Sequence, residues 1–201
     1  LANKSGELFL IDSSNKGITV TELVTVDKTR TSIELILDKV DATLLPGSSD
    51  ISVIEKVLDA GRLMLSADTV GASQVMLDKA VAYSLERKQF GRLIGSFQAV
   101  KHMCAEMAAE LEPCHSMIWH AAHSQDSSAE DARLMACQTK AHVSEVGKQV
   151  SKTATEVHGG MGFTDELGLH YWFKRIGLNR QLLGSPELIR EEAGKLQGFD
   201  Q

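Results

Sequence analysis

Apolar residues recur at helical spacing over a long stretch of this chain, from about residue 51 to residue 86. Two stretches of the same kind follow, and two shorter ones come after them, at about 95–124, 129–157, 165–175 and 185–196. A helix of 30 residues is about 45 Å long, and three such helices with short connections pack most readily as an antiparallel bundle. The pattern therefore predicts a mainly helical fold, an up-down bundle completed by the shorter helices.

The first 45 residues have a different pattern from the rest. Short runs rich in β-branched residues alternate there with turn residues, at 7–11, 18–21, 23–26 and 32–37. Three or four strands alone would leave open sheet edges, so we expect one piece of a longer polypeptide. Pro46 and Gly47 precede the first helical stretch and mark a boundary between a small β segment and the helices.

Charge and cysteine content narrow the classes of function. The net charge of −6 comes without a dense basic run, which disfavours a nucleic-acid partner. No apolar run reaches the roughly 18 residues of a membrane span, and no charged segment followed by an apolar one opens the chain, so we expect no export signal. Cys104, Cys114 and Cys137 form no CxxC pair, which favours reduced thiols. We expect a cytoplasmic protein.

A polar sequence interrupts the helical pattern between the first two long helices. We call residues 87–91 the RKQFG corner; it contains Arg87, Gln89 and Phe90, and Gln98 follows a few residues later. A guanidinium, a carboxamide and an aromatic ring suit a planar or phosphorylated ligand. The structural alternative is an Arg and a Gln that cap helix ends above a buried Phe90.

The third long helix ends in a sequence with three glycines, Gly159, Gly160 and Gly162, directly after His158. Glycine permits positive φ and close approach of the backbone, so this turn could present main-chain N–H groups to a phosphate. It could equally be only a helix stop. His115, His120 and His123 lie close together on the second helix, and a metal site there is a further alternative.

Taken together, residues 83–91, 94–98 and 157–163 resemble the acyl-CoA dehydrogenase family in content, order and separation. The resemblance covers about residues 20–197. It implies that residues 1–48 are the C-terminal part of a β-barrel-like domain. Residues 51–201 would be the C-terminal helical bundle domain of that family.

The resemblance implies a flavoprotein that uses FAD to oxidise an acyl-CoA thioester to the 2,3-enoyl-CoA. Electrons would pass to an electron-transfer flavoprotein, and the corner would serve the FAD of a neighbouring, homologous subunit. We therefore expect the RKQFG corner to be exposed at a subunit interface. The chemistry requires a carboxylate that removes the α-proton while the flavin accepts a hydride.

Individual residues can be carried over from the family motifs. The implied cofactor contacts are Arg87, Gln89, Phe90, Gln98, Glu156, Gly159, Gly160 and Gly184. Arg62 matches an arginine near the acyl site. Glu156 is a departure, since the family more often has Gln there; a carboxylate near the phosphates would cost about 1 to 4 kcal/mol per charge pair and weaken FAD binding unless a cation intervenes.

The catalytic base is the more important departure. The family takes it from the loop before the last helix or from the first bundle helix, and these positions are Leu183 and Gly61 here. Neither residue accepts a proton. Glu187 is nearby, but Ser185 and Pro186 before it form a helix start that explains an acidic residue structurally.

These observations predict an acyl-CoA dehydrogenase-like subunit that lacks its own base and pairs with a catalytic homologue. The first alternative is a conventional homo-oligomeric acyl-CoA dehydrogenase with its base elsewhere. The second is a helical metal-binding protein that uses the three histidines. Bound flavin in the purified protein separates the first two from the third.

Overall fold

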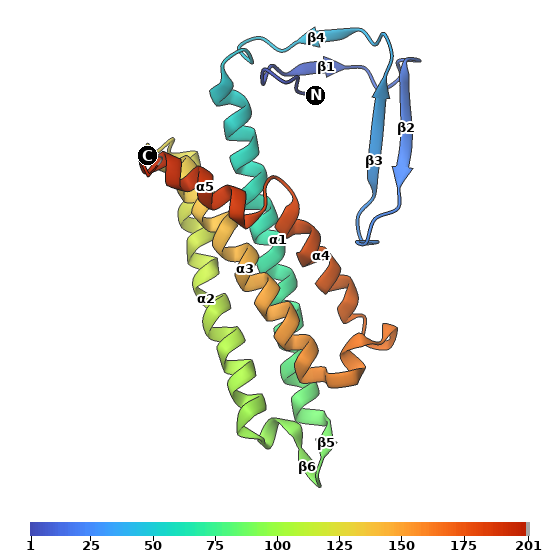
Figure 1. Ribbon diagram of the computed structural model, residues 1–201, viewed down its shortest axis with the longest axis vertical. Coiled ribbons are helices and arrows are strands. Elements are labelled where there is room, and N and C mark those ends of the chain that lie inside the picture. Colours follow the sequence, from blue (N-terminus) through green and yellow to red (C-terminus); the bar gives the residue numbers. More distant parts are fainter. Residues whose placement is uncertain (200–201) are drawn as a thin grey trace. The chain divides into compact units, whose positions relative to one another are not determined.

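The computed structural model describes residues 1–199 (Figure 1). The chain divides into two compact units, Leu1–Asp59 and Ala60–Gln201. The first unit contains short strands and the start of the first helix, and the second contains the helical bundle. The predicted fold class, mainly helical with a small β segment, is confirmed.

Four strands form two antiparallel ribbons in the first unit. β1 (Phe9–Ile11) pairs with β4 (Ala42–Leu44), and β2 (Ile18–Leu23) pairs with β3 (Ser32–Leu37). The strand predicted at 32–37 is confirmed, whereas β2 ends at Leu23 and residues 24–26 lie outside any strand. The sequence analysis did not predict β4. Apolar side chains of β2 and β3 are exposed, as expected of strands that lack a packed face.

Within the described residues, five α-helices follow: α1 (Ile51–Glu86), α2 (Gln98–Asp126), α3 (Ala132–His158), α4 (Leu169–Gln181) and α5 (Pro186–Leu196). The bounds of α1 agree with the sequence pattern. α4 begins later than predicted because Gly168, at φ +65°, separates it from a short 3₁₀ turn. Pro113 lies inside α2, which continues through it.

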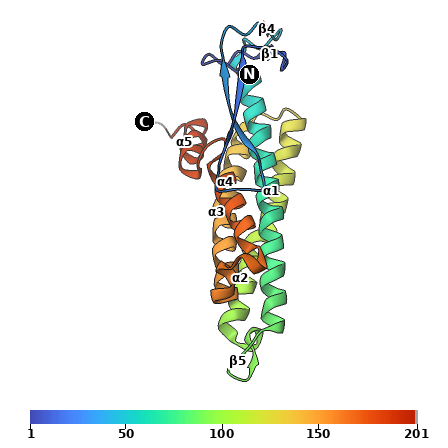
Figure 2. The same cartoon turned by 90° about the vertical axis from the view of Figure 1, so that its right-hand side faces the viewer.

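α3 lies at the centre of the bundle and packs against α2, α4 and α5 (Figures 1 and 2). The main core joins residues of α1, α2, α3 and α4, and includes Met76, Met107, Val150, Leu169 and Ile176. Met76 and Met107 are buried in this core, whereas Met64, on an apolar stretch of α1, is exposed. None of the helices in residues 1–199 combines the length and apolar character needed to cross a bilayer.

α1 and α3 approach each other closely where Gly147 faces Thr69. A Cβ on residue 147 would lie 2.4 Å from Thr69 Cγ2, so only glycine fits at this crossing. α4 is attached to the same part of α1 by a partly buried polar contact: Arg175 Nη2 donates to Asp68 Oδ1 at 2.7 Å and Asn179 Nδ2 to Asp68 Oδ2 at 2.6 Å. These contacts hold α4, and the loop after it, against the bundle.

Candidate functional site

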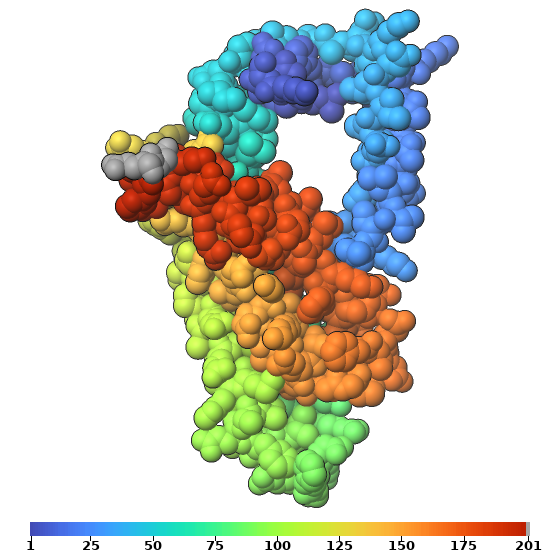
Figure 3. Space-filling model, viewed as in Figure 1, coloured from blue at the N-terminus to red at the C-terminus, as the bar shows by residue number. Residues whose placement is uncertain are grey.

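The two motifs singled out in the sequence line one pocket, although about 70 residues separate them. The pocket has a volume of about 380 Å³ and is lined by Tyr83, Arg87, Gln89, Ile94, Val157, His158, Gly159, Gly160 and Met161. One lining residue, Gln89, belongs to the hairpin of residues 88–93, which forms one end of the bundle (Figures 1 and 3). The fold therefore brings the RKQFG corner and the glycine-rich turn together.

The RKQFG corner is a β-hairpin rather than a simple helix-helix turn. β5 (Lys88–Gln89) pairs with β6 (Arg92–Leu93), and Phe90 and Gly91 form the turn with φ of +53° and +78°. Successive residues with positive φ are typical of a type I′ hairpin turn. The ring of Phe90 is 90% exposed, so the alternative of a helix cap above a buried Phe90 is wrong.

Aromatic contacts hold the exposed ring in place. Phe90 and Phe97 meet edge to face with their ring centroids 6.1 Å apart, and the Arg92 guanidinium lies 3.9 Å above the Phe97 ring. Gln98 is the first residue of α2, is exposed, and lies outside the pocket lining with its amide nitrogen 3.4 Å from His102 Nε2. Arg87 is exposed as well, so the hairpin presents a cation and a ring to solvent.

The three glycines of the turn differ in why the structure has glycine at each position. Gly159 adopts φ +58° and ψ −138°, a conformation open mainly to glycine. A Cβ at Gly162 would lie 2.6 Å from the Thr155 carbonyl oxygen, so Gly162 is required for packing. Gly160 has neither a positive φ nor any atom within 4 Å of an added Cβ. Its open surface leaves the backbone accessible to a ligand.

His158 forms the buried wall of the pocket, a role that the sequence analysis did not assign. Its Nδ1 donates to the Ala154 carbonyl oxygen at 2.7 Å, and its ring stacks on Tyr83 with centroids 4.6 Å apart. Burial lowers the pKa of His158 and favours the neutral ring. Its position before two glycines was the available signal for this role.

Glu156 is exposed on α3 and does not line the pocket. Its Oε1 lies 3.8 Å from Lys152 Nζ, one helical turn away. A nearby lysine is the kind of cation that would reduce the predicted repulsion between Glu156 and a phosphate.

Leu183 and Gly61, the two positions at which the sequence resemblance places a catalytic base, lie against each other. Leu183 Cδ1 is 2.5 Å from the point where a Cβ on Gly61 would stand, so the leucine side chain covers the glycine. Leu183 has φ +57° and its side chain is partly exposed. Gly184 has φ +109°, and a Cβ there would lie 2.6 Å from Ile189 Cδ1. The turn and this packing account for Gly184 within the chain, and its cofactor contact stays a prediction.

Glu187 has the structural role that the sequence suggested. Its carboxylate accepts a hydrogen bond from Arg180 Nη2 at 2.6 Å at the start of α5. Its own backbone N–H, then Ser185 and Arg180, lower the pKa of Glu187 to about 2. A carboxylate that binds its proton so weakly is a poor general base.

Arg62 is 7% exposed and its guanidinium is bound within the bundle. Nε donates to the Leu183 carbonyl oxygen at 3.2 Å, and Nη1 and Nη2 donate to the two Glu192 oxygens at 3.1 and 2.7 Å. Arg133 Nη2 also donates to Glu192 Oε1 at 2.6 Å. The contact of Arg62 with an acyl group stays a prediction, but its bond to the Leu183 loop, residues 182–184, is direct.

Lys140 binds the end of α4, directly before the Leu183 loop. Its Nζ donates to the carbonyl oxygens of Asn179 and Arg180, at 2.6 and 3.3 Å, at the C-terminal end of α4. Burial, together with the positive charges of Arg62 and Arg180, lowers the pKa of Lys140 to about 8. The sequence pattern marks neither Lys140 nor Glu192, because each is one charged residue on an otherwise ordinary helix.

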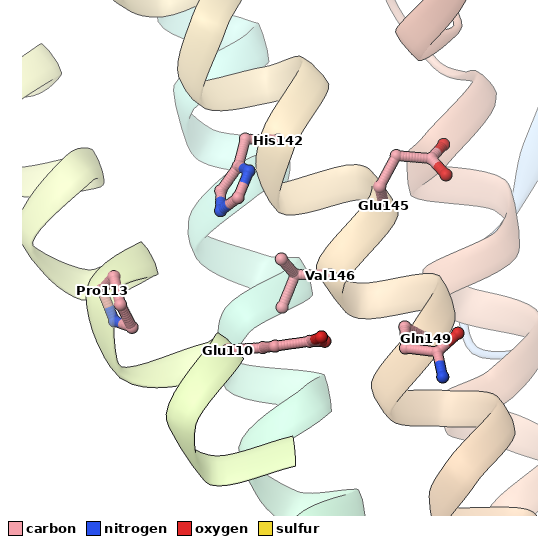
Figure 4. Close-up of a pocket in the computed structure, with 6 residues that line it drawn as sticks. All are labelled: Glu110, Pro113, His142, Glu145, Val146 and Gln149. Carbon is pink, nitrogen blue, oxygen red and sulfur yellow. The ribbon is translucent and has the colours of Figure 1, made fainter. Parts of the chain in front are cut away.

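A second, open pocket lies between α2 and α3, with a volume of about 640 Å³ (Figure 4). Glu110 and Pro113 of α2 face His142, Val146 and Gln149 of α3 across it. Glu145, on the same wall, is bound to Arg180 by its Oε1. Within residues 1–199, His115, His120 and His123 do not bring their ligand atoms together as a metal site requires.

The family model of the acyl-CoA dehydrogenase C-terminal domain matches residues 51–196. Acyl-CoA dehydrogenase IpdE2 of Mycolicibacterium smegmatis is 33% identical over 157 residues, which are 78% of this chain and 48% of the relative. The caffeyl-CoA reductase-Etf complex subunit CarC of Acetobacterium woodii is 38% identical over 111 residues, 55% of this chain and 29% of the relative.

Among solved structures, a variant of the Tcur3481-Tcur3483 steroid ACAD superposes with a TM-score of 0.87 at 28% identity. The match covers 96% of this chain and 52% of that one. The present chain thus spans about half of the relatives it matches, or less.

Proposed function

Because this chain belongs to the acyl-CoA dehydrogenase family, we propose that it is a flavoprotein subunit that holds FAD between its RKQFG corner and its glycine-rich turn, and that its own acyl site lacks a base. The reaction of the assembled protein would be the α,β-dehydrogenation of an acyl-CoA thioester. FAD, when bound, supplies the hydride acceptor. In this proposal residues 1–48 are the end of a β-domain and residues 51–201 are the bundle domain.

The observation that carries the FAD proposal is the pocket shared by the two motifs. Arg87 and Gln89 offer charged and amide N–H groups on one side, which suit pyrophosphate oxygens. On the other side, Gly160 offers open backbone that no packing requirement of the chain explains. Phe90 adds an exposed ring face that can contact a planar group. The chain therefore fits a ligand with both phosphate and an aromatic ring.

The pocket is solvent-exposed, and exposure supports a role that is completed by another subunit. Leu183 and Gly61 leave no carboxylate at either base position, which supports pairing with a catalytic homologue. The name of the Tcur3481-Tcur3483 steroid ACAD joins two components and is consistent with such pairing in a relative. A homo-oligomer whose base comes from another part of the polypeptide remains the second candidate.

Electron-transfer flavoprotein is the electron acceptor in this proposal. The name of the relative CarC places that protein in a reductase-Etf complex. The substrate of the present chain would be an acyl-CoA thioester, bound where α1 meets the Leu183 loop.

We expect Arg87→Ala to weaken FAD binding by the assembled protein about 10- to 150-fold, the effect of losing a charge-assisted phosphate contact worth about 1.5 to 3 kcal/mol. Arg190→Ala is the matched control, because it removes the same charge from an exposed site on α5. Flavin absorbance of the protein after gel filtration measures retention. Equal FAD retention by the two variants would contradict the assignment.

A further inference from the structure

The Leu183 loop has a conformation that its sequence does not favour. Leu183 adopts φ +57° and Gly184 φ +109°, and a leucine in the left-handed region is disfavoured by contact between its Cβ and the backbone. Such a conformation persists where surrounding contacts determine it. Arg62 makes such a contact directly, because its Nε donates to the Leu183 carbonyl oxygen. Lys140 binds the end of α4 just before the loop, at the Asn179 carbonyl oxygen.

Arg62 can hold that carbonyl only if its guanidinium stays in one orientation. The two Glu192 oxygens bind Nη1 and Nη2 at 3.1 and 2.7 Å, which is the paired geometry that orients a guanidinium. Nε is then left to point at the Leu183 carbonyl, 3.2 Å away. Arg133 binds the same carboxylate and keeps Glu192 in place, at 2.6 Å.

We propose that Glu192 is a positioning residue of the acyl site: through Arg62 it holds residue 183 over Gly61. This proposal rests on the proposed function, because Leu183 occupies a position from which the family takes its catalytic base. The residue type at 183 then determines the chemistry of the site, and Glu192 determines where that side chain stands. α5 thus contributes to the site without touching it.

A disulfide between residues 61 and 183 tests this placement without flavin or acyl-CoA. Leu183 Cδ1 is 2.5 Å from the ideal Cβ position of residue 61, and Cδ1 is two bonds from Leu183 Cβ. The Cβ atoms of residues 61 and 183 can therefore come within the distance of about 3.5–4.5 Å that a disulfide requires. Gly61→Cys and Leu183→Cys are combined in the full chain. Cys137→Ser is included because Cys137 Sγ lies 3.4 Å from Arg62 Nη1.

The measurement is the effective concentration of the two thiols, from equilibration with glutathione, in the parent and in two further variants. Glu192→Gln removes the charge that orients Arg62. The matched control, Glu191→Gln, makes the same change on the adjacent residue of α5, which is exposed and paired with Lys195. We expect Glu192→Gln to lower the effective concentration about tenfold, the effect of losing one charge-assisted hydrogen bond, and Glu191→Gln to leave it unchanged.

Arg62→Lys provides a second variant if Glu192→Gln does not fold. Lysine keeps the positive charge but cannot bind Glu192 and Leu183 at once, so we expect a similar decrease. Equal values for Glu192→Gln and Glu191→Gln, or no disulfide in the parent, would overturn the proposal. The disulfide measurement involves no cofactor, so its result is independent of the FAD retention experiment on Arg87. Failure of this proposal can therefore be distinguished from failure of the proposed function.

Discussion

Leu183→Glu is expected to give the FAD-loaded protein an acyl-CoA dehydrogenase activity that the unmodified chain lacks. The α-proton of a thioester does not leave without a positioned base, and general-base assistance is worth about 10²- to 10⁴-fold in rate. Residue 183 is partly exposed and is held over Gly61 by Arg62, so a carboxylate there would face the site that the family uses. Anaerobic bleaching of the flavin by acyl-CoA measures the gain.

Three further variants make this expectation specific. Leu183→Gln has the same size as the glutamate but cannot remove a proton, so it should remain inactive. The Gly61→Glu variant alone should have lower dehydrogenase activity than the Leu183→Glu variant, because the Cβ added at residue 61 would lie 2.5 Å from Leu183 Cδ1. Adding Leu183→Gly removes that obstruction and suits φ +57°, so the double variant should regain activity. Activity of Leu183→Gln equal to that of Leu183→Glu would exclude the glutamate as the base.

Gly147→Ala is expected to destabilise the bundle by about 1 to 3 kcal/mol, the usual cost of overpacking a core. The new Cβ would lie 2.4 Å from Thr69 Cγ2. Thr69 cannot turn away freely, because its hydroxyl donates to the Leu65 carbonyl oxygen and accepts from Asn179 Nδ2. Separation of α1 from α3 would also disturb the attachment of α4. Urea unfolding of the full chain measures the change.

Gly71→Ala is the control for the same substitution on an exposed part of α1. An added Cβ there meets no atom within 4 Å, so the higher helix propensity of alanine should stabilise the chain by up to about 1 kcal/mol. If both variants changed the free energy of unfolding equally, the close packing of α1 on α3 would not be what requires Gly147.

Periodicity alone predicted the helices well, because each long helix has a buried face that repeats every three or four residues. The bounds of α1 agree with that pattern. The helix predicted at about 165–175 runs instead from Leu169 to Gln181, because Gly168 ends a separate 3₁₀ turn before it. β4 was missed because a strand of three residues is too short to show alternation.

The candidate site was predicted in part. Arg87, Gln89, Gly159 and Gly160 were singled out by residue type, and the fold places them around one pocket. His158 was not, although it precedes two glycines, because its stacking on Tyr83 joins two helices. Lys140 and Glu192 were missed because their roles depend on contacts made across the bundle, which no local pattern records. The contact between Leu183 and Gly61 is of the same kind, since 122 positions separate them in the sequence.

The most direct test of a FAD-holding subunit without its own base is flavin bleaching with the unmodified chain as the only homologous subunit. The protein is loaded with FAD, made anaerobic and mixed with acyl-CoA thioesters of different chain length. We predict that FAD is retained and that its absorbance does not decrease, whereas Leu183→Glu under the same conditions is bleached. Rapid bleaching of the unmodified protein would show that it has a base, and an inability to retain FAD would show that the pocket between the corner and the glycine-rich turn does not hold this cofactor.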